Sequence, residues 1–235
     1  MLPPIPRPNG MSSAAASLRY WERRQEIAAN NMANVNTDGF KGERVFARLL
    51  NGAFPAADSA TDMRAGTLRP TGAPLDLALD GDAFLVVNTP RGERLSRGGS
   101  FRLDGAGQLL DPSGNPLQGE GGPIVVPDGA ELKIQADGRV LAGDKEVGRL
   151  RLESVPAGTR LQHDEGSLFV PAGNQPLAAG VAPVRQGFLE DSNVGAVGEM
   201  VDMISVQRSY ASVQKAMVTM DEIRGTISRE LGKPI

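Results

Sequence analysis

The side chains best suited to catalysis are few in this chain of 235 residues. His163 is its only histidine and it has no cysteine, so thiol nucleophiles, thiolate zinc sites and disulfides are excluded. A serine–histidine–aspartate triad would depend on His163 alone, and no G-x-S-x-G motif supplies the serine. Because the residues around His163 are polar and turn-rich, we expect a solvated surface histidine. The sequence therefore predicts no nucleophilic site.

Carboxylates and glycines give no stronger indication of chemistry. Asp76, Asp80 and Asp82 lie close enough in sequence to suggest a catalytic carboxylate pair or calcium ligands. However, the residues between the first two are strand-like, and the spacing of an EF-hand loop is absent. Gly98-Gly99 lacks the following Lys-Ser/Thr of a phosphate-binding loop. We predict no enzyme activity, no metal and no cofactor.

Charge and hydropathy exclude two classes of partner. The chain has 25 basic and 28 acidic residues, a net charge of −3, and no cluster of Lys and Arg that would bind nucleic acid. Nowhere do 18 apolar residues run together, so no membrane insertion is predicted. The proline-rich residues 1–10 lack the apolar run of a secretory signal peptide, and either Met1 or Met11 is a suitable start. We expect any export to need no cleaved signal.

The clearest structural pattern is an apolar line that follows this lead, with alternating spacings of three and four residues. It predicts a helix with one narrow seam, in which Gln25 is the polar member. The helix should end near Asn34, because Asn, Thr, Asp and Gly follow it and favour a turn. The seam consists of Met11, Ala14, Leu18, Trp21, Gln25, Ala28, Met32 and Val35.

The C-terminal region repeats this spacing along two lines and predicts a helix of about 38 residues, roughly 57 Å long. Ser192 or Asn193 is a suitable N-cap, and residues 232–234 are a suitable stop. An intramolecular pair needs one seam, so the second line favours contacts with neighbouring subunits; a simple intramolecular coiled coil is the alternative. The first line is Met203, Val206, Tyr210, Val213, Met217, Met220, Arg224, Ile227 and Leu231, and the second is Val197, Met200, Ile204, Ala211 and Val218.

The middle of the chain has a different texture. Asp-Gly pairs at 80, 104, 128 and 137 separate short apolar runs, which predicts hairpins with type I′ turns. We therefore expect an α+β fold with a central antiparallel, turn-rich β domain and the N- and C-terminal helices paired as a coiled-coil-like domain. The predicted divisions are a flexible lead (1–10), the N-terminal helix and turn (11–40), an irregular connector with a short helical piece at 43–50 (41–74), the β domain (75–187) and the C-terminal helix (188–235).

Several segments carry a family resemblance. Residues 28–41 closely resemble the N-terminal signature of the flagellar rod, hook and hook-associated family, ANN-(L/M)-AN-x-x-T-x-GFK. Residues 186–194, followed by EMVDMI at 199–204 and QRSY at 207–210, resemble its C-terminal signature, G-x-LE-x-SNV…EMV-x-MI…QR-x-Y. Residues 75–84 and 96–101 resemble two central motifs, although Ala83 replaces a usual Gly and Ala211 a common Glu.

This resemblance implies a structural subunit of the bacterial flagellar basal-body rod that polymerises through its terminal helices. It implies export by the flagellar type III apparatus, partners among other rod subunits (copies and relatives), and a rod that spans the periplasm. The short middle and residues 121–127 are most similar to proximal-rod members. Distal-rod or hook-type subunits are the alternatives within the family. A glycan-binding adhesin on a coiled-coil stalk is the alternative outside it, although residues 75–187 contain no Trp or Tyr.

The signature residues are the candidates for assembly contacts. For the asparagines we leave two roles open: capping the helix end, or bonding to a neighbouring subunit. Gly39 is expected to have positive φ, and Phe40 to anchor the outgoing chain, in its own core or elsewhere. Arg208 and Asp202 suit either a solvated face or an intersubunit ion pair. The full candidate set is Asn30, Asn31, Asn34, Asn36, Gly39, Phe40, Ser192, Asn193, Val194, Met200, Val201, Ile204, Arg208, Tyr210, Val213 and Met217.

Overall fold

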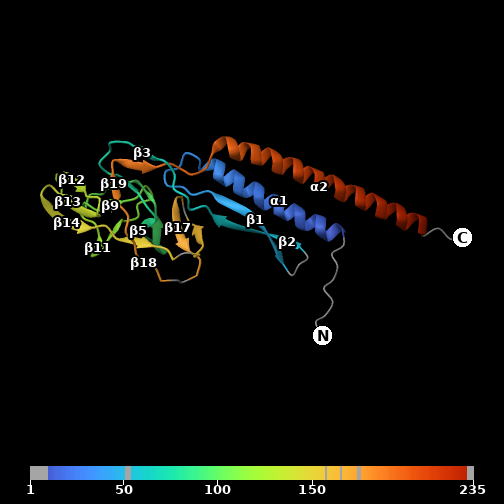
Figure 1. Cartoon of the computed structure of the whole chain (residues 1–235), viewed down its shortest axis with the longest axis horizontal. Coiled ribbons are helices and arrows are strands. Elements are labelled where there is room, and N and C mark those ends of the chain that lie inside the picture. The colour runs from blue at the N-terminus through green and yellow to red at the C-terminus, as the bar shows by residue number, and fades with distance from the viewer. Residues whose placement is uncertain (1–9, 51–53, 157, 165, 174–175, 232–235) are drawn as a thin grey trace, which may run out of the picture. The chain divides into compact units, whose positions relative to one another are not determined.

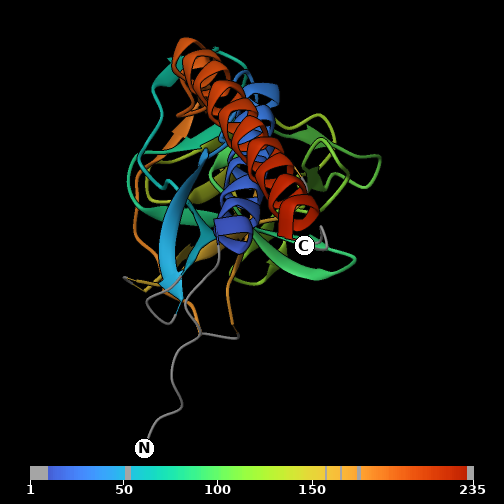
Figure 2. The ribbon, with the colours of Figure 1, turned by 90° about the vertical axis from the view of Figure 1, so that its right-hand side faces the viewer.

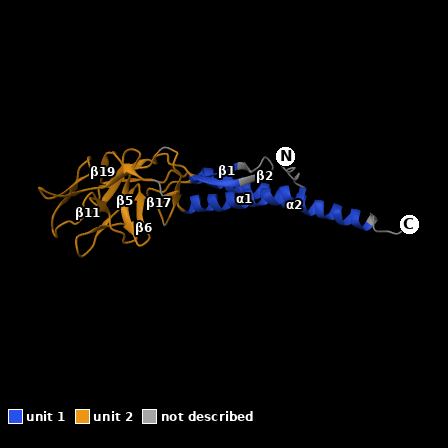
Figure 3. Ribbon diagram, turned by 90° about the horizontal axis from the view of Figure 1, so that it is seen from below, with its two compact units in different colours: residues 1–33, 43–60, 195–235 blue, residues 34–42, 61–194 orange. Residues whose placement is uncertain are grey.

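The structure is a computed structural model that describes residues 10–50, 54–156, 158–164, 166–173 and 176–231. Its described part is α+β, with helices α1 (Gly10–Ala33) and α2 (Ala196–Leu231) towards the two ends and antiparallel strands between them (Figure 1). This confirms the predicted class. The chain divides into unit 1, residues 1–33, 43–60 and 195–235, and unit 2, residues 34–42 and 61–194 (Figure 3).

In unit 1, α1 and α2 lie side by side and run in opposite directions (Figures 1 and 2). Asn31 contacts Glu199 at one end of α1, and Gly10 lies beside Met220 at the other, where an added Cβ would be 3.3 Å from the sulfur. The α1 residues that become buried are mostly small, which permits close approach. They are Ala14, Ala16, Ile27, Ala28 and Asn31.

The two apolar lines of α2 have different surroundings. On the first line Val206 is fully buried, and Tyr210, Val213 and Met217 are half-buried. The second line is exposed. Its exposed fractions are 76% for Val197, 54% for Met200, 51% for Ile204 and 59% for Val218. Beyond Met220 the first line is exposed as well, since Ile227 is 51% exposed.

Residues 43–50, predicted as a helical piece, are instead the strand β1 (Glu43–Leu50), so that prediction was wrong. It forms a two-stranded sheet with β2 (Phe54–Thr61). The physical reason is a contact with α1. The side-chain amide of Asn31 accepts from the backbone N–H of Glu43 and donates to its C=O, both at 2.9 Å, which holds the backbone extended. A helix this short gains too little on its own to compete, because isolated helices below about 12–15 residues are marginal in water.

Unit 2 consists of short antiparallel strands. Its largest sheet has the order β16-β17-β6-β5-β15-β18; two sheets of three strands are β19-β4-β7 and β12-β13-β14; β20-β3, β10-β11 and β8-β9 are pairs. Their bounds are β3 (Leu68–Pro70), β4 (Asp76–Leu79), β5 (Ala83–Thr89), β6 (Gly92–Ser96), β7 (Gly98–Ser100), β8 (Arg102–Leu103), β9 (Leu109–Leu110), β10 (Gln118–Gly119), β11 (Gly122–Pro123), β12 (Leu132–Ile134), β13 (Arg139–Ala142), β14 (Lys145–Arg149), β15 (Leu152–Ser154), β16 (Leu161–His163), β17 (Leu168–Pro171), β18 (Ala178–Ala179), β19 (Val184–Gln186) and β20 (Phe188–Glu190).

The Asp-Gly pairs mark turns, but not all of them close hairpins. Asp104-Gly105 joins the paired strands β8 and β9, and Asp137-Gly138 joins β12 and β13. The type I′ prediction was wrong for the first of them, because the residue with positive φ in that loop is Gly107 and not Gly105. Asp80-Gly81 and Asp128-Gly129 instead connect strands that belong to different sheets. For these two pairs the hairpin prediction was wrong, because a turn residue permits a change of direction without selecting the next partner strand.

Strand β5 separates two apolar cores. Leu85 and Val87 belong to the larger core, whereas Phe84 and Val86 point into a smaller one with Phe169. Side chains alternate between the two faces of a strand, so a run that is apolar at every position is buried on both faces. This places the centre of unit 2 at residues 84–87.

Candidate functional site

A buried ionic cluster occupies the place in unit 2 where the two terminal signatures and one central motif meet. Lys41 Nζ donates to Glu190 Oε1 at 2.5 Å, and Arg97 Nε donates to Glu190 Oε2 at 3.1 Å. The side chains of Lys41 and Glu190 are 0% and 1% exposed, and that of Arg97 is 4% exposed. Burial lowers the pKa of Lys41, an effect that its hydrogen bond to Glu190 opposes.

The polar groups of this cluster are satisfied from several segments. Lys41 Nζ also donates to the carbonyl of Arg64 at 2.9 Å, and Glu190 Oε1 also accepts from the backbone N–H of Gly66 at 2.8 Å. Arg97 donates to the carbonyls of Leu79 and Ala83. A buried ion pair is tolerated only when its remaining donors and acceptors find partners, and here they do.

Phe40 and His163 pack beside this cluster. The ring of Phe40, 2% exposed, stacks on the imidazole with centroids 4.7 Å apart, and Phe169 lies 4.9 Å away on another side. His163 Nε2 is 2.5 Å from the carbonyl oxygen of Lys41. The prediction of a solvated histidine was wrong, because β16 pairs with β17 and brings this ring against two aromatic rings. Phe40 thus belongs to the core of its own chain.

The residues before α2 do not cap it as predicted. The helix begins at Ala196, and the carbonyl of Gly195 accepts the N–H of Glu199. Ser192 instead accepts from the N–H of Val194. The side chain of Asn193 ties segments of unit 2 together: its oxygen accepts from the N–H of Gly42 at 2.8 Å, and its amide donates to the carbonyls of residues 62 and 64.

In unit 1, Asn31 connects α1, β1 and α2. Besides its two bonds to Glu43, its amide donates to Glu199 Oε1 at 3.1 Å, and Asn31 is only 3% exposed. Burial raises the pKa of Glu199; the hydrogen bond from Asn31 lowers it, and the nearby charge of Asp202 raises it further. Asn31 therefore has a role within its own chain that is neither capping nor an intersubunit bond.

Two further polar contacts join α1 to α2. Arg24 donates two hydrogen bonds to the carboxylate of Asp202, at 2.8 and 2.9 Å, and this bond raises the pKa of the guanidinium. The hydroxyl of Tyr210 bonds to Glu22 Oε1 at 3.1 Å. Asp202 is thus paired within its own chain, whereas Arg208 is exposed on the same helix.

The remaining signature residues divide between the helix end and the surface. Asn34 shapes the turn, since its carbonyl accepts the N–H of Thr37 at 3.1 Å and its side-chain oxygen accepts the hydroxyl of that residue. Gly39 has φ of 70°, as expected, and its N–H donates to the carbonyl of Glu190. Those that remain exposed are Asn30, Asn36, Met200, Val201 and Ile204.

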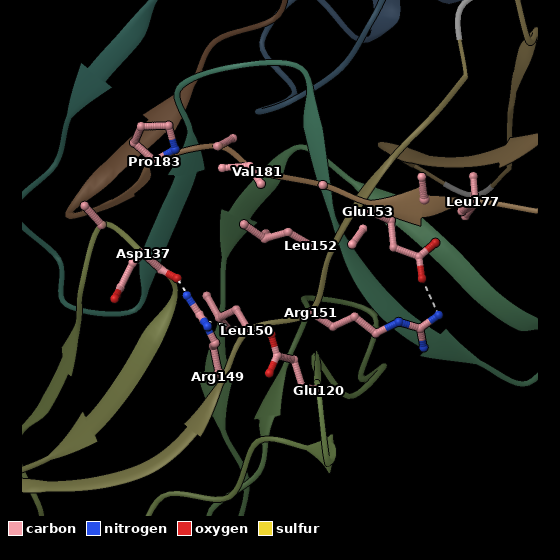
Figure 4. A pocket seen from close by; sticks show the side chains of 15 residues that line it. Glu120, Asp137, Arg149, Leu150, Arg151, Leu152, Glu153, Leu177, Val181 and Pro183 are labelled. Atoms are coloured by element: carbon pink, nitrogen blue, oxygen red, sulfur yellow. Dashed lines mark hydrogen bonds and ion pairs between the residues drawn. The ribbon is translucent and has the colours of Figure 1, made fainter.

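A groove of about 790 Å³ lies on unit 2 beside β15 and β18 (Figure 4). Apolar side chains such as Leu150 and Leu152 line part of it, and two ion pairs lie along it: Arg151 with Glu153, and Arg149 more loosely with Glu120 at 3.9 Å. No set of catalytic groups converges there. Among the described residues, no cluster of side chains suits a metal ion, and neither helix combines the length and apolar character needed to cross a membrane.

Sequence reasoning missed the ionic cluster. Lys41 and Glu190 lie in the two signatures, but no contact was predicted for either side chain, and Arg97 was not among the candidate residues. The sequence offered only a weak signal, a charge directly after an apolar residue in each signature, Lys41 after Phe40 and Glu190 after Leu189.

Comparisons with known proteins follow the same segments. Residues 21–41 match the family described as Flagella basal body rod protein, residues 78–142 the Flagellar hook protein FlgE/F/G D1 domain, and residues 185–230 the Flagellar basal body rod FlgEFG protein C-terminal. The chain is 34% identical over 231 residues to the flagellar basal-body rod protein FlgF of Escherichia coli (88% of this chain, 92% of the relative). It is 33% identical to FlgF of Caulobacter vibrioides (90% and 93%) and 30% identical to the rod protein FlgG of Bacillus subtilis (90% and 94%).

Proposed function

This chain belongs to the flagellar basal-body rod protein family and is a structural protein rather than an enzyme, and from that premise we propose that it polymerises through the apolar surfaces that α2 leaves exposed. The second apolar line of α2 carries this proposal. Val197, Met200, Ile204 and Val218 are all more than half exposed on one face of a helix. Soluble monomers rarely leave such a continuous apolar strip uncovered.

The lengths of the two helices support a second contact. α2 has 36 residues and α1 has 24, and Met220 faces the first residue of α1. The first line of α2 therefore continues past its intramolecular partner, with Arg224 and Ile227 exposed. We propose that α1 and α2 pair in a coiled-coil-like manner and that neighbouring subunits cover both the second line and this extension. Burial of each of these half-exposed side chains contributes about 1 kcal/mol.

The partners and location follow from the same premise. The chain is a component of the flagellar basal body, and we propose that other rod subunits, copies or relatives, supply the covering helices. We further propose a place in the proximal rod, export by the flagellar type III apparatus without a cleaved signal, and assembly across the periplasm. The FlgF relatives at 33–34% identity support the proximal position, with the FlgG-like distal position as the alternative.

Two single substitutions test the assembly surfaces. Ile204→Asp places a charge on the second line, and Ile227→Asp places one on the extension of the first. Ser212→Asp, at an exposed position off both lines, is the matched control. Each variant is expressed in a strain that lacks the gene, and purified hook–basal bodies are probed for the protein.

We expect full-length protein and the control in that fraction, with Ile204→Asp and Ile227→Asp absent from it. The purified variants should melt as the parent does, because both isoleucines are half-exposed in the monomer. Normal incorporation of the two isoleucine variants would show that these surfaces are not the contacts. Absence of the unaltered protein from basal bodies would reject the rod function itself.

A further inference from the structure

The ionic cluster joins parts of the chain that are far apart in sequence around a single carboxylate. Lys41 lies in the N-terminal turn (residues 34–42), Gly66 precedes β3, Arg97 lies between β6 and β7, and Glu190 ends β20. All three polar partners bind the same side chain, Oε1 contacting Lys41 and Gly66, and Oε2 contacting Arg97.

The charges of this cluster are not balanced symmetrically. Two cations share one anion, so removal of either cation leaves a matched pair, whereas removal of Glu190 leaves two cations in one buried site. An unpaired charge in a protein interior is strongly unfavourable, and two like charges in one site are worse. The N-terminal turn, which carries Lys41, therefore depends more on β20, which carries Glu190, than β20 depends on the turn.

We infer that Glu190 acts as an electrostatic latch, so that docking of the N-terminal turn into unit 2 requires β20 to be in place first. Once β20 pairs with β3, the carboxylate already has the guanidinium of Arg97 and the N–H of Gly66 as partners. This arrangement is neutral and needs nothing from the N-terminal turn. Lys41, by contrast, would meet Arg97 in the same buried space if it arrived before Glu190.

The latch concerns the chain's own folding and does not depend on the proposed role in assembly. Docking of the N-terminal signature then depends on the C-terminal signature, although the contacting residues Lys41 and Glu190 are 149 residues apart in sequence. A chain whose C-terminal signature is missing or undocked would keep its N-terminal turn undocked as well. Only a chain with both signatures present docks its N-terminal turn into unit 2.

Hydrogen–deuterium exchange of the full chain, followed by mass spectrometry, tests the direction of the dependence. In Glu190→Gln, we expect amides of residues 36–42 to exchange on the order of a hundredfold faster, the equivalent of breaking a buried pair. In Lys41→Met, the N-terminal turn should exchange faster while β20 stays protected within about threefold of the parent. Equal loss of β20 protection in the two variants would overturn the latch, as would unchanged exchange of residues 36–42 in Glu190→Gln.

A second variant keeps the test decisive if Glu190→Gln does not fold. The double variant Lys41→Met/Glu190→Gln removes one of the two uncompensated cations. It should restore protection of β20 relative to Glu190→Gln alone, because only Arg97 then remains without a counter-charge. If the two substitutions instead add their damage, the cluster is an ordinary set of contacts and the inference fails.

Discussion

The two units differ in which side chains they bury: unit 2 buries charged side chains, whereas unit 1 leaves apolar ones exposed. Unit 2 buries Lys41, Arg97 and Glu190 almost completely and encloses two apolar cores. In the part of unit 1 that the structure describes, few residues are buried, and α2 leaves large apolar side chains such as Val197, Val218 and Ile223 exposed. Unit 2 thus satisfies its own residues, whereas unit 1 has apolar surface that a single chain does not cover. Signature residues occur in both, so a signature alone does not show whether a residue serves folding or assembly.

The largest expected effect lies in unit 2. Phe169→Ala removes a ring that is fully buried between Phe84 and His163. We expect it to lower the free energy of unfolding by about 3–5 kcal/mol, as for other buried aromatics. Urea denaturation followed by circular dichroism measures this change. If Ile227→Ala on α2 were equally destabilising in the monomer, the contrast between the units would be wrong.

An intermediate effect is expected where unit 1 does bury a polar group. Asn31→Ala leaves the N–H and C=O of Glu43 and the carboxylate of Glu199 without this partner. Loss of partners for buried polar groups costs about 1–3 kcal/mol. Gln25→Ala is the control, since Gln25 is an exposed polar residue of the same helix and its loss should change stability by less than about 0.5 kcal/mol. Urea denaturation that gave equal losses for both would mean that Asn31 does not hold α1, β1 and α2 together.

The smallest effect is a pH dependence that originates in unit 1. The pKa of Glu199 is raised in the folded state, mainly by burial, so the folded chain binds its proton more tightly than the unfolded chain does. Stability from this group is therefore present below its unfolded pKa and is lost as pH rises through the raised folded pKa. Glu199→Gln keeps an oxygen that accepts from Asn31 and should be slightly more stable than the parent at pH 7.

The difference should disappear at a pH below the unfolded pKa of Glu199, where the parent is also protonated. Thermal melts of both proteins at the two pH values check this expectation. A stabilisation that persists unchanged at low pH would assign the effect to packing and not to the charge.

Patterns with a short repeat were readable from the sequence. The three-four spacing located both helices, and the end predicted near Asn34 agrees with α1 ending at Ala33. The separation of α2 into two apolar lines was also visible, and the structure shows that they differ in burial. Short-range spacing suffices here because a helix places residues three and four apart on one face.

Features that depend on distant partners were not readable. β1 is a strand because Asn31, twelve residues earlier, binds both backbone groups of Glu43. His163 is partly buried because β17 brings Phe169 beside it, and Glu190 is central because Lys41 and Arg97 reach it from distant segments. Local composition at each of these positions is polar or mixed, so only the tertiary arrangement distinguishes them from surface residues.

The division of the chain also bears on how proteins of this plan can vary in size. Unit 1 is assembled from three separate stretches, 1–33, 43–60 and 195–235, and most of unit 2 is one continuous insertion between the last two. Lengthening a surface loop of that insertion costs only about 0.6 kcal/mol for each doubling of the loop. We therefore expect a longer loop at the surface of unit 2 to leave the contacts between α1 and α2 in place.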